Sequence, residues 1–433
     1  MFPRQFATRR RFARAMFLAV CLVPTLAIAS WGLWRQAPWH AAQIAARVGA
    51  TLDLSCNIAA VEHVRPGALR LRGLVLRNSE TGRLVCECSV VDARRADRRI
   101  EIKVSKAEVD VEQRATIWRA CERLLRRQIQ DGSAMAFTAS ELQLLSDRAS
   151  HKLHDLDAIV PGGDDAAALD IRFHSSREPA AAPVNLHLER SRGEHPVTTL
   201  LVDSAGQELD CSLLGCGSSA FDGLGPRATF AGRFSVAFDE QVQTELAGKF
   251  REVDLGRLAA GYLDQHVEGA AQLDVVHVKC VDSKLETAQA RITGGPGVIS
   301  TALCRSLAVE LQMPAARRAT QPNGDALVVF EKLDAEFWLE RRGIALRGHC
   351  NEPGQGPELR SGVVLADAEG PLLAEPESPQ TLVALVRGLA AAEVPELPAT
   401  TAARRLAAAL PLERAAAEAI ARPPERADSS TRR

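Results

Sequence analysis

Residues 68–91 read ALRLRGLVLRNSETGRLVCECSVV, and this stretch predicts the fold of most of the chain. Leucine and arginine alternate over 68–72, which is the period of a strand with one buried and one solvated face. Gly73 breaks the alternation and predicts a β-bulge. The polar run NSETGR at 78–83 supplies turn residues, and 84–91 is apolar and strand-like again. The stretch therefore predicts a β-hairpin.

Similar short runs recur along the rest of the chain, and their close spacing predicts a meander of antiparallel strands. They lie at 100–104, 109–111, 134–138, 141–145, 169–173, 184–188, 198–202, 228–238, 242–250, 271–279, 285–292, 326–331, 335–340 and 343–348. Helical periodicity is confined to short segments at 41–48, 115–128, 254–262 and 300–311. The glycine-rich run GGPG at 294–297 predicts a turn before the last of these helices. The fold class is thus mainly β (α+β).

The first 40 residues predict where the protein resides. An apolar run over 15–35 follows a tail with five arginines, and the first acidic residue is Asp53. Twenty helical residues span about 30 Å, the thickness of a bilayer core. The basic tail, 1–14, is expected in the cytoplasm, so the remaining chain is expected in the periplasm, held by a single-pass signal-anchor in the inner membrane.

Removal of the N-terminus is the alternative. Ala27, Ile28 and Ala29 form a small-x-small cleavage pattern, and Pro24 precedes them. The apolar run nevertheless continues through Trp31 and Trp34, whereas signal peptides usually become polar at this point. Retention as an anchor is the favoured reading. In either case 36–394 is expected as an exported β-rich domain, and 395–433 as an Ala- and Pro-rich tail, partly disordered, that reads as a weak helix and a disordered end.

Composition excludes several functions. The net charge of −1 argues against a nucleic-acid partner. Ten cysteines follow no disulfide framework, and Cys211 and Cys216, which flank a short turn, are the candidate pair. Cys86 and Cys88 alternate in a strand, which favours core packing over chelation. No motif predicts a catalytic group, a metal site or a cofactor.

Four local patterns could carry chemistry, and each has a simpler reading. His151 and His154 would share a helix face and could bind a metal, but a solvated segment is the preferred interpretation. The run GCGSS at 215–219 departs from the nucleophile-elbow motif because its serine is misplaced. The GGPG run is not followed by a Lys-Ser/Thr pair, so phosphate binding is disfavoured. Arg94, Arg95, Arg98 and Arg99 could contact anionic headgroups, with a solvated loop as the default.

Three segments, 55–95, 247–304 and 330–350, together resemble bacterial AsmA-like envelope proteins, in particular short, single-anchor, planctomycete-like members. The resemblance rests on strand patterns and glycine placement and covers most of the exported chain. It implies a long curved antiparallel sheet behind the anchor, groove-like, whose apolar face shields lipid chains. A sheet that folds over onto itself, as in a sandwich, fits the residues equally well.

The first hypothesis is therefore a non-enzymatic, membrane-anchored protein of lipid handling or outer-membrane homeostasis, with phospholipid as the ligand. Its groove would be lined by apolar residues of three strands: Leu69, Leu71, Leu74, Leu76, Phe230, Phe234, Val236, Phe238, Leu273 and Val275. The alternative is an anchored structural or adaptor protein whose fully packed β domain binds another envelope protein. An anchored hydrolase is disfavoured, since no acid–base or nucleophile constellation is present.

Overall fold

The structure, a computed structural model, describes residues 15–36, 38–96, 99–131, 134–146, 150–161, 166–175, 182–191, 195–214, 221, 223–263, 265–321, 326–350, 362–390 and 401–412. The chain forms two compact units, residues 1–176 (unit 1) and 177–433 (unit 2). Each unit is described by itself.

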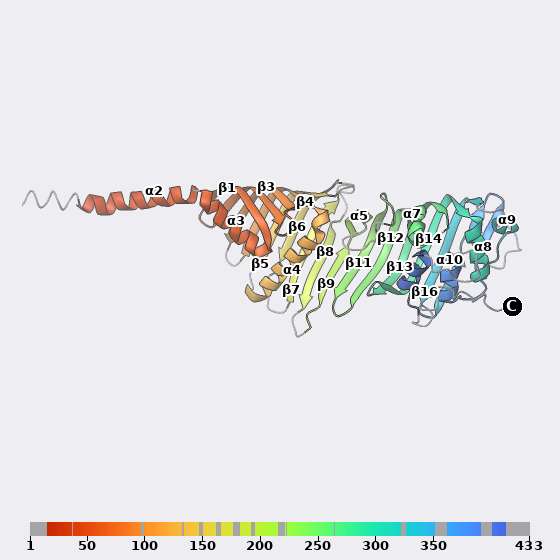
Figure 1. Ribbon diagram of the computed structural model, residues 1–433. Coiled ribbons are helices and arrows are strands. Elements are labelled where there is room, and N and C mark those ends of the chain that lie inside the picture. Colours follow the sequence, from red (N-terminus) through yellow and green to blue (C-terminus); the bar gives the residue numbers. More distant parts are fainter. Residues whose placement is uncertain are drawn as a thin grey trace, which may run out of the picture. The chain divides into compact units, whose positions relative to one another are not determined.

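Unit 1 is a sheet with helices at its start and between two of its strands. Its elements are η1 (Leu18–Leu22), α2 (Val23–Gln36), α3 (Pro38–Leu52), β1 (Leu54–Arg65), β2 (Ala68–Asn78), β3 (Leu84–Ala96), β4 (Arg99–Asp110), η2 (Val111–Gln113), α4 (Arg114–Asp131), β5 (Ala134–Leu145), β6 (Ser150–Val160) and β7 (Ala166–Ser175). Neighbouring strands pair in sequence order. Figure 1 shows α3 and α4 on one face of these strands.

The pairing of β4 with β5 differs from the predicted meander. These two strands run parallel, with Arg99 opposite Ala134 and Asp110 opposite Leu145. All other pairs of unit 1 for which the structure gives a register are antiparallel. The 18-residue helix α4 lies between the two strands and returns the chain to its starting end. Such a crossover is what a parallel connection requires, because a tight turn can only reverse direction.

Gly73 has a φ of +60°, and the buried leucines on either side of it, Leu71 and Leu74, are three residues apart. Residues three apart in a regular strand point to opposite faces, so the strand carries one extra residue here, as the sequence predicts. The register with β3 is nevertheless unchanged, because Leu71 pairs with Val91 and Leu74 with Cys88.

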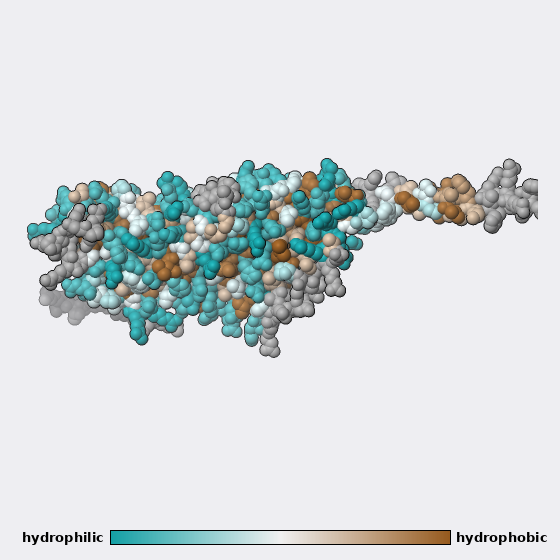
Figure 2. Space-filling model, turned by 180° about the vertical axis from the view of Figure 1, so that it is seen from behind, coloured by the Kyte–Doolittle hydropathy of each residue, from teal (hydrophilic) through white to brown (hydrophobic). Residues whose placement is uncertain are grey.

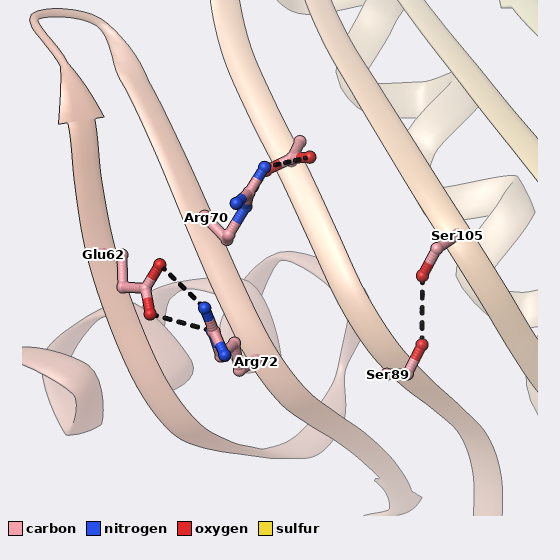
Figure 3. A network of polar contacts seen from close by, with 6 residues as sticks. Glu62, Arg70, Arg72, Ser89 and Ser105 are labelled. Carbon is pink, nitrogen blue, oxygen red and sulfur yellow. Dashed lines mark hydrogen bonds and ion pairs between the residues drawn. The ribbon is translucent and has the colours of Figure 1, made fainter.

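The register is preserved because every other strand of β1–β6 also has one extra residue in its inward–outward alternation, at the position that pairs with this part of β2. Each has two inward-facing apolar residues three positions apart: Ile58 and Val61, Cys88 and Val91, Val104 and Ala107, Ala139 and Leu142, Leu153 and Leu156. Small residues occupy this line in five of the six strands: Ala59, Gly73, Ser89, Ser105 and Ser140. The hydroxyls of Ser89 and Ser105 lie 3.1 Å apart across it (Figure 3). Because the extra residues of neighbouring strands lie side by side, the apolar side chains on both sides of them stay on the same face of the sheet across β1–β6.

Unit 2 is antiparallel in every pair for which the structure gives a register. Its elements are β8 (Val184–Ser191), β9 (Thr198–Asp203), β10 (Leu209–Asp210), α5 (Cys211–Leu214), β11 (Thr229–Phe238), β12 (Val242–Asp254), α7 (Leu255–Tyr262), β13 (Val267–Val281), β14 (Lys284–Ser300), α8 (Thr301–Glu310), α9 (Arg317–Thr320), β15 (Leu327–Phe330), β16 (Lys332–Glu340), β17 (Gly343–Gly348), β18 (Val363–Asp367), β19 (Gly370–Ala374), α10 (Leu382–Ala390) and α11 (Thr401–Ala409).

Two parts of unit 2 differ from the prediction. The GGPG run does not form a turn: it lies inside β14, where Gly294 pairs with Ala271 and Gly297 pairs with both Gly269 and Phe330. The predicted tail contains α11, whose residues Ala407 and Leu410 are buried in the same core as α8 and α10. The folded part of the chain therefore extends beyond 394, because the alanines of α11 form an apolar face that the sheet and helices cover.

The predicted fold class is confirmed: the chain is mainly β, with an apolar N-terminal helix and few other helices. Helices cover one face of the strands in each unit. The face away from the helices is mainly hydrophilic, with scattered apolar side chains (Figure 2). This arrangement explains the alternation in 68–91, since a sheet with one packed and one solvated face needs apolar and polar residues in turn.

Candidate functional site

The predicted groove residues of β2 face the apolar side of unit 1. Leu71 and Leu74 are buried, and Leu69 and Leu76 are half-buried. Leu71, Leu74 and Leu76 belong to one apolar cluster with residues of the neighbouring strands and of α3. The face that the sequence predicts for these leucines is therefore the packed face of the sheet.

Four of the six predicted residues of unit 2 belong to one apolar cluster: Phe230, Phe234, Leu273 and Val275. Phe230 is fully buried, and its ring centroid lies 4.9 Å from that of Phe250. Phe221 is 6.2 Å from Phe250 and 5.9 Å from Phe234, the latter edge to face. The other predicted residues of this unit are buried (Val236 and Val275) or half-buried (Phe238 and Leu273). Around Phe230 the apolar face is covered by protein.

Several half-buried apolar residues of unit 1 were not among the predicted groove residues. They come from β4, β5 and β7 and pack at the margin of the same cluster as Leu71: Ile102, Phe137, Leu142, Leu169, Ile171 and Phe173. The alternation of 169–173 indicates that these side chains share a face, but it does not indicate how much of them another element covers. These side chains are less buried than Phe230, although Phe234 and Leu273 are half-buried at the margin of the Phe230 cluster in the same way.

Among the described cysteines Cys88, Cys211 and Cys304 are buried, Cys21 is exposed and the others are half-buried. Cys86 and Cys88 have their sulfur atoms 3.6 Å apart, and Cys88 packs in the core, in agreement with the predicted packing role. Contact with Cys88 and burial raise the pKa of Cys86. Burial, with a smaller effect from Asp210, raises the pKa of Cys211 to about 12. Cys216 lies outside the described residues, so the predicted Cys211–Cys216 disulfide stays a prediction. A thiol with a raised pKa is a poor nucleophile at neutral pH.

Ion pairs cover the polar face of β1–β4. Arg70 donates two hydrogen bonds to Asp92, at 2.7 and 3.1 Å, and this contact lowers the pKa of Asp92. Arg72 pairs with Glu62 at 2.8 Å, as Figure 3 shows. Exposed pairs of this kind contribute little stability individually, about 0–1 kcal/mol. They keep the face soluble and specify which strand lies beside which.

Arg318 of α9 and Asp367 of β18 form a two-fold contact, with N–O distances of 2.9 and 2.7 Å. The hydrogen bonds from Arg318 lower the pKa of Asp367. A carboxylate with a lowered folded-state pKa contributes stability above its unfolded pKa, and this contribution is lost as the pH falls through the folded pKa.

We therefore expect Asp367→Asn to lower the free energy of unfolding at pH 7 by about 1 kcal/mol, allowing for the partial exposure of Arg318. The difference between variant and parent should shrink as the pH falls below about 4, the ordinary range of an aspartate. Urea titrations at pH 7 and at low pH measure it. Asp239→Asn, at an exposed position, is the control and should have little effect at either pH. A difference that is independent of pH would contradict the assignment.

The candidate metal residues are not brought together. His151 and His154 lie on β6, a strand, and not on a helix. In the described ranges no group of three or more His, Cys, Asp or Glu side chains is arranged to hold a metal ion. A different histidine pair is in contact: Nε2 of His40 on α3 lies 3.0 Å from Nε2 of His63 on β1.

The N-terminal helix fits the predicted anchor. Residues Ala15–Gly32 have a mean hydropathy of 1.9, and none of this window is buried against protein. The helix is therefore long and apolar enough to cross a membrane. At its end, the Trp34 ring lies 4.9 Å from that of Trp39 and 5.2 Å from that of His40, which links α2 to α3.

Comparison with known proteins leaves the family open: the chain matches no family model, no curated protein and no solved structure. The resemblance to AsmA-like proteins thus stays a prediction from the sequence, and function has to be argued from the residues themselves.

Proposed function

We propose that this chain is a non-enzymatic envelope protein that is held in the inner membrane by the helical segment Ala15–Gly32, which ends in α2, and whose unit 1 binds lipid acyl chains on its apolar face. The N-terminal arginines and the absence of acidic residues before Asp53 support a cytoplasmic tail and a periplasmic bulk.

One observation carries the proposal: apolar side chains at the margin of the unit 1 cluster are only half-buried. Phe137, Leu142 and Phe173 pack against the cluster but keep part of their surface exposed. Each methylene group moved from water onto an apolar surface contributes about 0.8 kcal/mol. An acyl chain with about ten methylenes against this margin would gain about 8 kcal/mol before the entropy cost of binding.

Site-specific photo-crosslinking tests this in the full-length protein within its own membrane. Benzoylphenylalanine is placed at Phe137 or Phe173, cells are irradiated, and lipid adducts are detected by mass spectrometry of the purified chain. The matched control is Gln143, which lies on the opposite face of β5 from Leu142 and Leu144. A second control is Phe250, which is 3% exposed in the sealed core of unit 2.

We expect lipid adducts at Phe137 and Phe173 and none at the two controls. Equal labelling at Gln143 would mean that lipid contacts the domain without selecting a face. Absence of lipid at Phe137 and Phe173, together with full incorporation of the photoreactive residue, would overturn acyl-chain binding on unit 1.

The second candidate function is an anchored adaptor that binds another envelope protein. The observation in its favour is the aromatic core of unit 2, in which Phe230 is fully buried and Phe250 is 3% exposed. A face sealed in this way offers a rigid scaffold and no room for an acyl chain. In the same crosslinking experiment, protein adducts at Gln143 with no lipid at Phe137 would favour this function.

A further inference from the structure

Two neighbouring turns of unit 1 present arginines that lack an acidic partner. Arg65 ends β1, and Arg95 and Arg99 flank the connection between β3 and β4; all three are exposed. The turns are held together, because the backbone N–H of Arg95 donates to the carbonyl oxygen of Gly67 at 2.9 Å. Within the described residues, none of the three arginines forms an ion pair.

Three arginines on the faces of the same strands are paired with acidic residues. Arg70 binds Asp92, Arg72 binds Glu62 and Arg94 binds Glu101, as the contacts of Arg70 and Arg72 in Figure 3 illustrate. The unit thus neutralises these three arginines, whereas in the sequence of the two turns Arg65, Arg95, Arg98 and Arg99 outnumber the single acidic residue Asp97. Because the whole chain has a net charge of only −1, this positive charge is a local feature.

The same turns lie near the C-terminal end of the N-terminal apolar helix. His63 contacts His40 at the start of α3, and His40 packs against Trp34 at the end of α2. Arg65 is two residues beyond His63, which is about 7 Å along a strand. Tryptophans at the end of a spanning helix are typical of the membrane–water interface, so Trp34 and Trp39 mark the level of the headgroups. The arginines of the turns lie close to that level.

We propose that Arg65, Arg95 and Arg99 bind the headgroups of anionic phospholipids in the membrane that the N-terminal apolar helix spans. The planar guanidinium donates paired hydrogen bonds to phosphate oxygens, and it keeps its charge at any physiological pH. Each basic residue held near an anionic surface strengthens association about fivefold. The contact would fix the orientation of unit 1 on the bilayer. It rests on the proposed anchoring by this helix and is independent of acyl-chain binding.

Hydrogen exchange of the full-length protein in lipid nanodiscs tests the proposal. The protein is reconstituted in discs of neutral phosphatidylcholine and in discs containing about one third phosphatidylglycerol. Exchange is followed by mass spectrometry in the peptides that contain the two turns. We expect exchange at both turns to be at least about fivefold slower over the anionic lipid, and raised salt to remove most of this protection, since charges are then screened within a few ångströms.

The test variant combines Arg65→Gln, Arg95→Gln and Arg99→Gln. The control variant combines Arg83→Gln, Arg114→Gln and Arg342→Gln, which removes the same charge at exposed positions outside the two turns. The test variant should lose the lipid-dependent protection, and the control variant should keep it. An unchanged exchange rate in the core strands confirms that both variants are folded.

Equal exchange over neutral and anionic discs would overturn the proposal. So would protection over neutral discs on addition of millimolar inorganic phosphate, which would assign the arginines to a soluble anion. Neither result bears on lipid adducts at Phe137, so failure here and failure of acyl-chain binding are distinguishable.

Discussion

Replacing Phe230 with alanine is expected to lower the free energy of unfolding of unit 2 by about 4 kcal/mol. The ring is fully buried and packs against Phe250. It also lies over a pair of opposed glycines, since a Cβ at Gly232 or Gly248 would come within 3.0 or 2.9 Å of its ring atoms. Glycines have no side chain to move into the space left by the ring, so the cavity would persist and its full cost would remain.

Urea titration followed by circular dichroism measures this loss. The control is Val276→Ala, which removes apolar surface from a neighbouring part of the sheet at a site that is 59% exposed. That variant should change the unfolding free energy by less than about 0.5 kcal/mol. A loss below about 1 kcal/mol for Phe230→Ala would contradict the sealed core and would reopen this face of unit 2 as a ligand site.

Gly297→Ala is expected to destabilise unit 2 by about 3 kcal/mol. An added Cβ would lie 2.3 Å from the carbonyl oxygen of Glu268 and 2.4 Å from the Cζ of Phe330. One neighbour is backbone of the paired strand β13, and the other is a ring that is 1% exposed. Neither can move without opening the sheet or the core, so the substitution should lower the melting temperature by about 6–12 °C.

Gly261→Ala is the matched control for this prediction. Gly261 lies in α7, and a Cβ there would meet nothing within 4 Å. Alanine at a helical position should be neutral or stabilising, by up to about 1 kcal/mol. Differential scanning fluorimetry of the two variants measures both effects. Equal melting temperatures would mean that the GGPG run is a loop, as its sequence predicts, and does not form part of β14.

Local patterns in the sequence predicted the features that depend on neighbouring residues. The alternation of apolar and polar residues around Leu71 and the extra residue at Gly73 are both present in β2. Helix starts are also encoded locally: the carboxylate of Asp254 accepts from the N–H of Arg257, and the hydroxyl of Ser300 accepts from the N–H of Leu303. These side chains satisfy N–H groups that the helix itself leaves unpaired, which is a property of a few adjacent residues.

Other features were missed because they depend on residues far apart in the chain. The GGPG run has the composition of a turn, yet it forms a strand because β13, β15 and β16 surround it and require close backbone approach. The sequence predicts a weak helix after Pro395, but it does not indicate that Ala407 and Leu410 enter a core made by other elements.

The sequence by itself thus determined the strand content, the apolar N-terminal helix and the face of β2 that carries leucine. These follow from the two-residue period of strands and from the length of an apolar run. Only the tertiary structure decided that Phe230 is fully buried and Phe137 half-buried, and that β5 runs parallel to β4. It also decided that the turn after Arg65 is bonded to Arg95, through the carbonyl oxygen of Gly67. The physical reason is that the burial of a side chain, the direction of a strand and the neighbours of a charged group depend on which distant segment packs against the residue. The period of the local pattern and the composition do not identify that segment.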